Sequence, residues 1–287
     1  MGRPRSVSTS VRIGLAQLLV EGGEAARNLD RAAALVAQAA ALGCQIVLLP
    51  ECLDLGWTHP SAMHEAQPIP GPISERLGAL AREFGIFVCG GLTEREGDRT
   101  YNTAVLLDPA GALLLKYRKI NLLVVEQPYY SVGRSLSVVE TALGVVGVNV
   151  CADNYADSLA IGHTLARMGS QIILSPSSWT VDYSIGEGED PYGQKWIAPY
   201  TLLARLYDLV MVGTTSVGYI VGGPYEGKKM VGCSLVVNKD GVLARGRYLE
   251  FASDLVTVDV PVPVRPEKGT AIGEMLKRKG YRFDGLA

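Results

Sequence analysis

Hydrophobic and polar residues alternate along the chain in two patterns, which predict strands and helices in turn. Residues 11–16 alternate with a period of two, which is typical of a half-buried strand. Residues 24–42 instead place apolar side chains at helical spacing, and Gly43 ends that segment. The run at 46–49 is wholly apolar, as expected of a strand that is covered on both faces. The chain therefore begins with a predicted strand, helix and buried strand.

The same order of elements recurs further along the chain. The rest of a first block is predicted at residues 72–84 (helix), 86–91, 103–107 and 112–116 (strands). A second block is predicted at residues 145–150, 157–168, 172–174, 194–207, 209–212, 234–237 and 243–247. Turn sequences at 108–111 and 238–241 join the last two strands of each block into a hairpin. Two such blocks predict an internally duplicated α/β domain with two mixed sheets and helices on their outer faces.

No long linker rich in Pro, Gly or Ser divides the two blocks. We predict one domain at residues 11–262, a flexible leader at 1–10 and a C-terminal tail at 263–287. The net charge of −2 offers no basic excess for a phosphate backbone, so we expect no nucleic-acid partner. No apolar run approaches the roughly 20 residues of a membrane helix, and no apolar segment follows the basic N-terminus as in a secretory signal. We therefore expect a cytoplasmic protein without a membrane partner.

The cysteines and histidines narrow the possible chemistry further. The chain has 5 cysteines, none of them spaced as Cys-x-x-Cys, namely Cys44, Cys52, Cys89, Cys151 and Cys233. An odd count in apolar surroundings argues against a disulfide framework and a zinc site, and favours a reducing compartment. We expect neither a metal nor another cofactor. All the cysteines except Cys151 are interpreted as packing residues.

Three polar residues follow predicted strands or hairpins. Glu51 ends the stretch "IVLLPE", Lys119 lies in "YRKINL" after the first hairpin, and Cys151 ends "VVGVNVC". In open α/β sheets the ends of strands face the ligand crevice, so catalytic groups collect there. A thiol has an ordinary pKa of about 8.5 and needs a base or a nearby cation to become a nucleophile. A carboxylate can take its proton and a lysine can stabilise an oxyanion, so these residue types together indicate thiol-based acyl transfer.

The motifs "LLPE" and "YRKINL" and the strand-end cysteine, in this order and at these separations, are similar to those of the nitrilase (carbon–nitrogen hydrolase) superfamily. The resemblance covers residues 11–260 and extends to "SPSSW", "LLARLYDLVMVGTTSVG" and "GCSLVVNKDG". It implies an α-β-β-α sandwich, which agrees with the duplicated pattern. It also implies a homodimer or a higher homo-oligomer.

The resemblance implies a role for each matching residue. Glu51 would be the general base and acid, Cys151 the nucleophile and Lys119 the stabiliser of the oxyanion. Glu126, in "LLVVEQPYYSVG", matches a second glutamate of the family that positions the lysine and the substrate. The backbone N–H of Ala152 would be the other oxyanion donor.

The substrate is less well defined by the motifs. Many family members follow the cysteine with a run close to x-D-x-R-F-P-E, of which this chain keeps only Asp153. True nitrilases place tryptophan and glutamate directly after the cysteine, whereas this chain has Ala152 and Asp153. We therefore favour a small amide over a nitrile as substrate, and an N-carbamoyl compound stays open as the alternative. We predict substrate contacts from Ala152, Tyr130, Tyr155 and Trp179.

Several alternatives remain open. The acidic loop within residues 179–196 could favour neutral or cationic amides, or could simply be solvated. A thioester on Cys151 could pass to another acceptor, which would make the protein an acyltransferase. A non-catalytic binding protein of the same fold would have no need of all three catalytic residue types. A Cys–His dyad is not favoured, because the helix predicted at 157–168 carries His163 away from the strand end.

Overall fold

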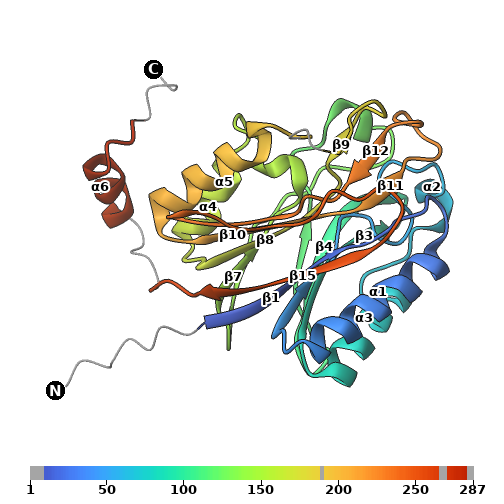
Figure 1. Ribbon diagram of the computed structural model, residues 1–287, viewed down its shortest axis with the longest axis horizontal. Coiled ribbons are helices and arrows are strands. Elements are labelled where there is room, and N and C mark those ends of the chain that lie inside the picture. Colours follow the sequence, from blue (N-terminus) through green and yellow to red (C-terminus); the bar gives the residue numbers. More distant parts are fainter. Residues whose placement is uncertain (1–9, 188–190, 265–269, 283–287) are drawn as a thin grey trace.

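The computed structural model describes residues 10–187, 191–264 and 270–282. Two large mixed sheets face each other and carry helices on their outer sides (Figure 1). The first sheet has the order β15 (Asp254–Pro261), β1 (Ser10–Gln17), β2 (Ile46–Leu48), β3 (Phe87–Glu96), β4 (Arg99–Leu107) and β5 (Leu113–Arg118). The second has the order β14 (Gly241–Arg245), β13 (Leu235–Asn238), β10 (Val210–Thr215), β8 (Ile172–Ser177), β7 (Gly144–Val148) and β6 (Val138–Thr141).

The two sheets repeat one topology. In each, three parallel strands are followed by two antiparallel strands, and a further antiparallel strand covers the remaining edge. The parallel strands are β1, β2 and β3 in the first sheet and β7, β8 and β10 in the second. The predicted duplication and the α-β-β-α class are therefore confirmed. The edge strands β15 and β6 were not predicted.

Helices cover the outer face of each sheet. The helices α1 (Ala25–Ala41) and α3 (Pro72–Phe84) pack on the first sheet, and α4 (Ala160–Arg167) and α5 (Gln194–Tyr207) pack on the second. A short helix α2 (Ala62–Glu65) follows β2, and a small third sheet contains β11 (Val217–Tyr219), β12 (Lys229–Val231) and β9 (Thr180–Val181). Within the described ranges, no helix combines the length and apolar character that crossing a membrane requires.

The core lies between the sheets and under the helices. Strand β8 is buried along its whole length, as expected of a parallel strand that is covered on both faces. Strand β1 packs against β10 and β3 against β8, so the inner faces of the two sheets are in direct contact. This packing holds the ends of β2, β5, β7 and β8 at one edge of the molecule, which is where the predicted catalytic residues lie.

The C-terminal part of the chain ends in a helix that packs on the domain. Helix α6 (Thr270–Arg278) buries Ile272 and Leu276 fully. The Lys279 ammonium donates hydrogen bonds to backbone carbonyls at the end of α5, and the Tyr281 hydroxyl lies 3.1 Å from His163 Nε2. His163 also contacts Tyr207, so it belongs to this helix packing and not to the strand ends. The expected leader lies, except for Ser10, outside the described residues, and the domain boundaries stay a prediction.

Candidate active site

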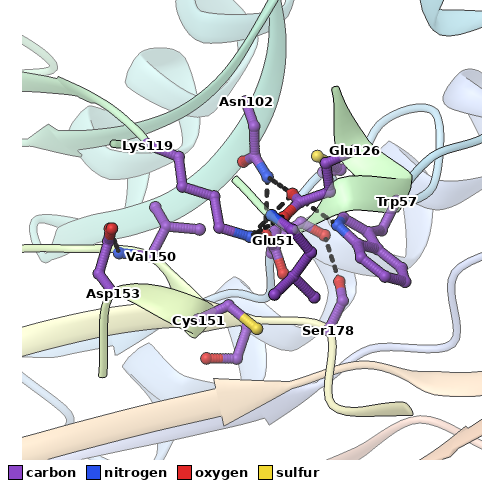
Figure 2. Close-up of polar contacts among 12 residues, drawn as sticks. Glu51, Trp57, Asn102, Lys119, Glu126, Val150, Cys151, Asp153 and Ser178 are labelled. Atoms are coloured by element: carbon purple, nitrogen blue, oxygen red, sulfur yellow. Dashed lines mark hydrogen bonds and ion pairs between the residues drawn. The ribbon is translucent and has the colours of Figure 1, made fainter. Parts of the chain in front are cut away.

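The ends of three strands bring Glu51, Lys119 and Cys151 to one region (Figure 2). Glu51 comes three residues after β2, Lys119 directly after β5 and Cys151 three residues after β7. Because β2 and β7 are parallel-sheet strands in facing sheets, their carboxyl ends meet at the same edge of the sandwich. The backbone N–H of Glu51 donates to Ser177 O at 3.3 Å, which ties the end of β2 to the end of β8 in the other sheet.

The two oxygens of Glu51 differ in their hydrogen bonding. Glu51 Oε1 accepts hydrogen bonds from Lys119 Nζ at 2.8 Å and from Asn102 Nδ2 at 2.6 Å. Glu51 Oε2 is buried and has no hydrogen-bond partner among the described residues. A buried carboxylate oxygen without a donor is costly, so it marks a position that is set aside for a proton or a substrate.

Both oxygens of the other glutamate are occupied. Glu126 ends the short 3-10 helix η1 (Val124–Glu126) and is fully buried. Its Oε1 accepts from Lys119 Nζ at 2.8 Å, from Trp57 Nε1 at 2.8 Å and from Asn102 Nδ2 at 3.2 Å. Its Oε2 accepts from Lys119 Nζ at 3.0 Å and from Leu123 N at 2.8 Å. So many donors fix the carboxylate in place, which suits positioning of the lysine better than proton transfer.

Cys151 sits on a strained turn. It begins the 3-10 helix η2 (Cys151–Asn154) with a φ of 43°, in the left-handed region that residues other than glycine seldom adopt. Its backbone N–H donates to Ser175 Oγ at 3.2 Å, and the residue is only 4% exposed. Such strain persists where the surroundings fix the backbone, and it is frequent at functional sites. In the view of Figure 2, Cys151 lies below Glu51, between Asp153 and Ser178.

Asp153 connects the cysteine turn to the lysine segment. Its Oδ2 accepts from Val150 N at 2.9 Å and from the Tyr117 hydroxyl at 2.7 Å. Its Oδ1 accepts from Asn121 N at 2.9 Å. Val150 directly precedes Cys151, whereas Tyr117 and Asn121 lie two residues on either side of Lys119. One buried carboxylate therefore holds the backbones that carry the thiol and the ammonium.

Burial and the neighbouring charges shift the pKa of each group in the cluster. Burial raises the pKa of Glu51, although the Lys119 ammonium opposes that shift. For Lys119, burial alone would lower the pKa, but Glu126 and Glu51 together outweigh it and raise the pKa well above its usual range. Burial, and then the Glu51 carboxylate, raise the pKa of the Cys151 thiol. A thiol with a raised pKa is protonated at neutral pH, so Cys151 would need a base in order to act as a nucleophile.

The four residues predicted to contact substrate have different surroundings in the structure. Ala152 follows Cys151 in η2 and is buried, and Tyr155 ends that turn half-buried, with its ring stacked 5.0 Å from that of Trp196. Trp179 is only 1% exposed and stacks on Trp196 at 4.8 Å, so its ring faces are largely covered by other aromatic side chains. The Tyr130 hydroxyl accepts from Thr58 N at 3.1 Å, which engages it with the loop after Glu51.

The acidic loop is only partly described. The Asp182 carboxylate forms an ion pair with Lys228 at 2.9 Å, which offsets one negative charge of the loop. Glu187 is exposed. Glu189 and Asp190 lie outside the described residues. Selection of substrates by this loop therefore stays a hypothesis.

Sequence reasoning missed two side chains of the cluster. Asn102 lies within β4 and donates to both Glu51 and Glu126. Trp57 follows β2 and donates its indole N–H to Glu126. The sequence carried little signal for Asn102, which precedes the strand predicted at 103–107 and lies in the polar first half of β4. Nothing near Trp57 in the sequence indicated that its indole would reach a carboxylate so far along the chain.

A small cavity reaches Glu51. Its volume is about 20 Å³, and Trp57, Ser178, Ser216 and Met230 are among its lining residues. It has room for about one water molecule, and neither Cys151 nor Lys119 is among its lining residues. In the part of the chain that the structure describes, no group of three or more His, Cys, Asp or Glu side chains is arranged to hold a metal ion.

The chain is similar in sequence and in fold to several known proteins. Omega-amidase NIT2 from Xenopus tropicalis is 36% identical over 180 residues, which cover 59% of this chain and 64% of that protein. A nitrilase from Pyrococcus abyssi is 32% identical over 95% of this chain and 99% of its own length. Among solved structures, a carbon-nitrogen hydrolase from Helicobacter pylori has a TM-score of 0.79 at 19% identity, covering 96% of this chain and 97% of its own.

An amidase from Nesterenkonia sp. AN1 has a TM-score of 0.73 at 24% identity, covering 88% of this chain and 93% of its own. That structure is of a mutant and shows the result of Michael addition of acrylamide at the active-site cysteine. At these identities the two solved structures establish likeness of fold. The sequence profile described as carbon-nitrogen hydrolase matches residues 12–265, which is most of the sandwich and includes Glu51, Lys119 and Cys151. The chain therefore belongs to the carbon–nitrogen hydrolase family.

Proposed function

We propose that this protein hydrolyses a small amide to an acid and ammonia through a thioester on Cys151. The observation that carries the proposal is the free Oε2 of Glu51, on a carboxylate whose other oxygen is held by Lys119 and Asn102. Among the residues that the structure describes, that arrangement leaves one fixed, desolvated oxygen as a proton acceptor beside a protonated thiol.

In the first step, the sulfur of Cys151 bonds to the amide carbon while its proton passes to Glu51 Oε2. The carbonyl oxygen becomes an oxyanion, which the Lys119 ammonium and the Ala152 N–H would stabilise. Glu126 does not exchange a proton in this scheme, because both its oxygens are held by donors from Lys119 and other residues. Its charge instead keeps the ammonium in position.

In the second step, Glu51 returns the proton to the leaving nitrogen, and the carbon–nitrogen bond breaks to release ammonia. The acyl group remains as a thioester on Cys151. Glu51, again ionised, takes a proton from water as the water oxygen attacks the thioester carbon. The carbon–sulfur bond then breaks, the thiol is reprotonated and the acid leaves. One carboxylate thus serves as base and acid in turn.

The comparisons support the choice of an amide. Omega-amidases and an amidase are among the proteins that this chain resembles, and the cysteine of the solved amidase reacts with an added electrophile. The residues after Cys151 lack the tryptophan–glutamate pair expected of true nitrilases. We also propose a cytoplasmic location, because all five cysteines are buried free thiols. A homo-oligomeric state stays a prediction from the family resemblance.

Ammonia release from matched substrates tests the proposal. Propionamide, propionitrile and N-carbamoylglycine would be compared at equal concentration, with and without hydroxylamine. We expect ammonia and propionate in equal amounts from the amide, and a hydroxamate at the expense of the acid when hydroxylamine competes for the thioester. A higher kcat/KM for the nitrile or for the carbamoyl compound would replace the amide as the substrate class. No ammonia from any small amide would refute the proposal.

Exchange of Asp153 for asparagine should separate the thiol from its partners. Asparagine keeps the shape but offers one acceptor oxygen where Val150 N, Tyr117 and Asn121 N require two. Because misplacement by about 1 Å can cost about 100-fold in rate, we expect kcat to fall by about 10- to 100-fold with KM changed less than about threefold. Steady-state kinetics of amide hydrolysis measure both constants.

Asp108→Asn is the matched control. The Asp108 carboxylate also accepts two backbone N–H bonds, from Ala110 at 2.9 Å and Ala112 at 2.8 Å, but in an exposed turn away from the site. It should leave kcat unchanged. A wild-type kcat in Asp153→Asn, or an equal loss in both variants, would show that Asp153 does not position the site. The Tm of each variant would be measured by thermal unfolding, so that the kinetics are recorded at a temperature well below it.

A further inference from the structure

Asn102 and Lys119 close a ring of hydrogen bonds with the two buried glutamates (Figure 2). Lys119 Nζ lies 2.8 Å from Glu51 Oε1 and 2.8 Å from Glu126 Oε1. Asn102 Nδ2 donates to the same two oxygens, at 2.6 Å and 3.2 Å respectively. Donors and acceptors therefore alternate around four atoms, and both hydrogens of the amide nitrogen are used. The ring holds one oxygen of each carboxylate and leaves Glu51 Oε2 without a donor among the described residues.

We propose that Asn102 is a positioning residue of the reaction, which fixes the Glu51 carboxylate with Oε2 free to take the thiol proton and keeps that carboxylate ionised until it does. The inference rests on the proposed function, since that function makes Glu51 the base for Cys151. Asn102 exchanges no proton in this scheme and acts only through Glu51.

The two carboxylates set the orientation of the Asn102 amide. Turned over, the amide would place its oxygen against two carboxylate oxygens, which repel it. In the observed orientation Oδ1 is buried and has no hydrogen-bond partner in the described part of the chain. An unpaired buried carbonyl oxygen is unfavourable, so the contact of the amide nitrogen with Glu51 and Glu126 outweighs that cost. The side chain is therefore directed by these two acceptors.

The backbone of Asn102 is held from both sides, which suits it to fix a neighbour. The residue lies within β4, pairs with Thr93 of β3 and is fully buried. Its carbonyl oxygen accepts a hydrogen bond from Lys119 N at 2.8 Å, directly after β5. Groups carried by the strands of a sheet are held more precisely than groups on loops. Asn102 therefore joins the backbone of Lys119 to the side chain of Glu51.

Glu51 depends on this amide more than Glu126 does. Within the described ranges, the Glu51 carboxylate accepts hydrogen bonds only from Lys119 and Asn102. The Glu126 carboxylate also accepts from two further donors, an indole N–H and a backbone N–H. Loss of the Asn102 amide would leave Glu51 with Lys119 as its single donor, free to turn about that contact. The effect should therefore appear in proton transfer by Glu51.

The charges around Glu51 make the same donor important for its ionisation. Burial raises the pKa of Glu51, and the Lys119 ammonium opposes that rise. The Glu126 charge adds to the rise, whereas the hydrogen bond from Asn102 opposes it. The other titratable groups that interact electrostatically with Glu51 are the thiols of Cys52 and Cys151 and the hydroxyl of Tyr155. Burial raises the pKa of all three, and groups of these types with a raised pKa are uncharged at neutral pH.

Asn102→Leu tests the inference, because leucine is similar in size to asparagine but donates no side-chain hydrogen bond. We expect kcat for propionamide to fall at least about tenfold with KM changed less than about threefold, since the reacting carboxylate loses its fixed position. The ratio of kcat/KM at pH 8 to that at pH 5.5 should rise at least about threefold above the wild-type ratio. The reason is that Glu51 without this donor becomes ionised only at a higher pH.

Asn28→Leu is the matched control. Asn28 is also fully buried, but its amide nitrogen donates to backbone carbonyls, those of Glu21 at 2.7 Å and Asp54 at 2.9 Å. It should lower the Tm and leave kcat and the pH ratio unchanged. An equal change of the pH ratio in both variants would assign the effect to the loss of any buried amide and overturn the role of Asn102.

Asn102→Ser is a milder second variant for the case in which Asn102→Leu does not fold. A serine has one hydroxyl hydrogen and cannot donate to both glutamates at once. Its pH ratio should rise above the wild-type ratio by at least about twofold and stay below that of Asn102→Leu where both are measured. Wild-type kcat and a wild-type pH ratio in Asn102→Ser would overturn the inference.

The outcomes separate this inference from the proposed function. If the wild-type protein hydrolyses propionamide and Asn102→Leu keeps its kcat and pH ratio, the positioning role is wrong and the amidase assignment stands. If no amide is hydrolysed, the proposed function fails, and unfolding in urea decides on Asn102.

The urea measurement does not depend on turnover. A pKa of Glu51 that is higher in the folded than in the unfolded state lowers stability as the pH rises above the unfolded value. Because Asn102 opposes that raised pKa, the decrease of the urea midpoint in Asn102→Leu should be larger at pH 7 than at pH 5. The decrease in Asn28→Leu should be the same at both. Equal decreases at the two pH values in Asn102→Leu would show that Asn102 does not keep Glu51 ionised.

Discussion

Cys151→Ala should abolish amide hydrolysis, with kcat reduced by at least about 10⁴-fold. Alanine removes the sulfur that would form the proposed thioester, and loss of a nucleophile commonly removes most of the rate enhancement of such a site. The fold should persist, because the exchange removes one buried sulfur atom and adds no bulk. Ammonia release under saturating propionamide measures the effect.

Cys89→Ala is the matched control for that variant. Cys89 is a fully buried thiol in β3, and its replacement by alanine leaves a similar cavity without touching the cluster. It should retain kcat, with a small decrease in the free energy of unfolding. Cys151→Ser adds a second test, because a serine hydroxyl is a far weaker nucleophile at this position, where only a carboxylate acts as base. Hydrolysis that survives in Cys151→Ala would exclude the thioester.

Local patterns predicted the larger elements of the fold well. Helices α3 and α5 occupy the predicted ranges, because each is a long amphipathic segment with clear ends. The short strands β9, β11 and β12 were missed. Their strand conformation depends on pairing between Tyr219 and Lys229 across a loop, and between Lys229 and Val181, which is far away in sequence. A local pattern does not contain such pairings. The edge strand β15 likewise depends on its distant partner β1.

The candidate site was predictable to the extent that its residues lie at the ends of strands. Glu51 and Cys151 follow apolar runs, and family resemblance joined Lys119 to them. Asn102 gave little signal, because its role depends on β4 lying beside Glu51 and Glu126. For Trp179, in contrast, the sequence suggested a role at the site, but the structure shows that its ring is covered. Its position after β8 suggested a substrate contact, but only the packing of α5 reveals that Trp196 covers its ring.

Lys119→Met should destabilise the protein strongly as well as inactivate it. The ammonium is fully buried and lies 2.8 Å from both Glu51 Oε1 and Glu126 Oε1. Methionine fills similar space but leaves two buried carboxylates facing each other without a cation. Removing one member of a buried ion pair commonly costs about 3–5 kcal/mol, and losing an oxyanion donor costs about 100- to 1,000-fold in kcat. Urea unfolding and amide hydrolysis measure the two effects.

Lys116→Met is the control, because Lys116 lies on β5 shortly before Lys119 and pairs from a partly exposed position with the buried Glu94. Arg118 also pairs with Glu94, so that carboxylate keeps a cation when Lys116 is replaced. We expect a loss of about 1 kcal/mol or less for this variant. A similar loss of unfolding free energy in both variants would show that the burial of Lys119 between two carboxylates does not make it more important for stability than Lys116. Lys119→Met/Glu126→Gln should recover part of the lost stability, since it removes one of the two stranded charges.

The pH dependence of Lys119→Met gives the sharpest test. In the wild-type protein burial already raises the pKa of Glu51 and Lys119 opposes that shift, so removing the lysine should raise the pKa further. A carboxyl whose pKa is higher in the folded than in the unfolded state binds more protons when folded, so stability falls as pH rises above the unfolded value of about 4.3. The destabilisation by Lys119→Met should therefore be larger at pH 7 than at pH 5. Equal destabilisation at both pH values would mean that Glu51 does not depend on Lys119 to stay ionised.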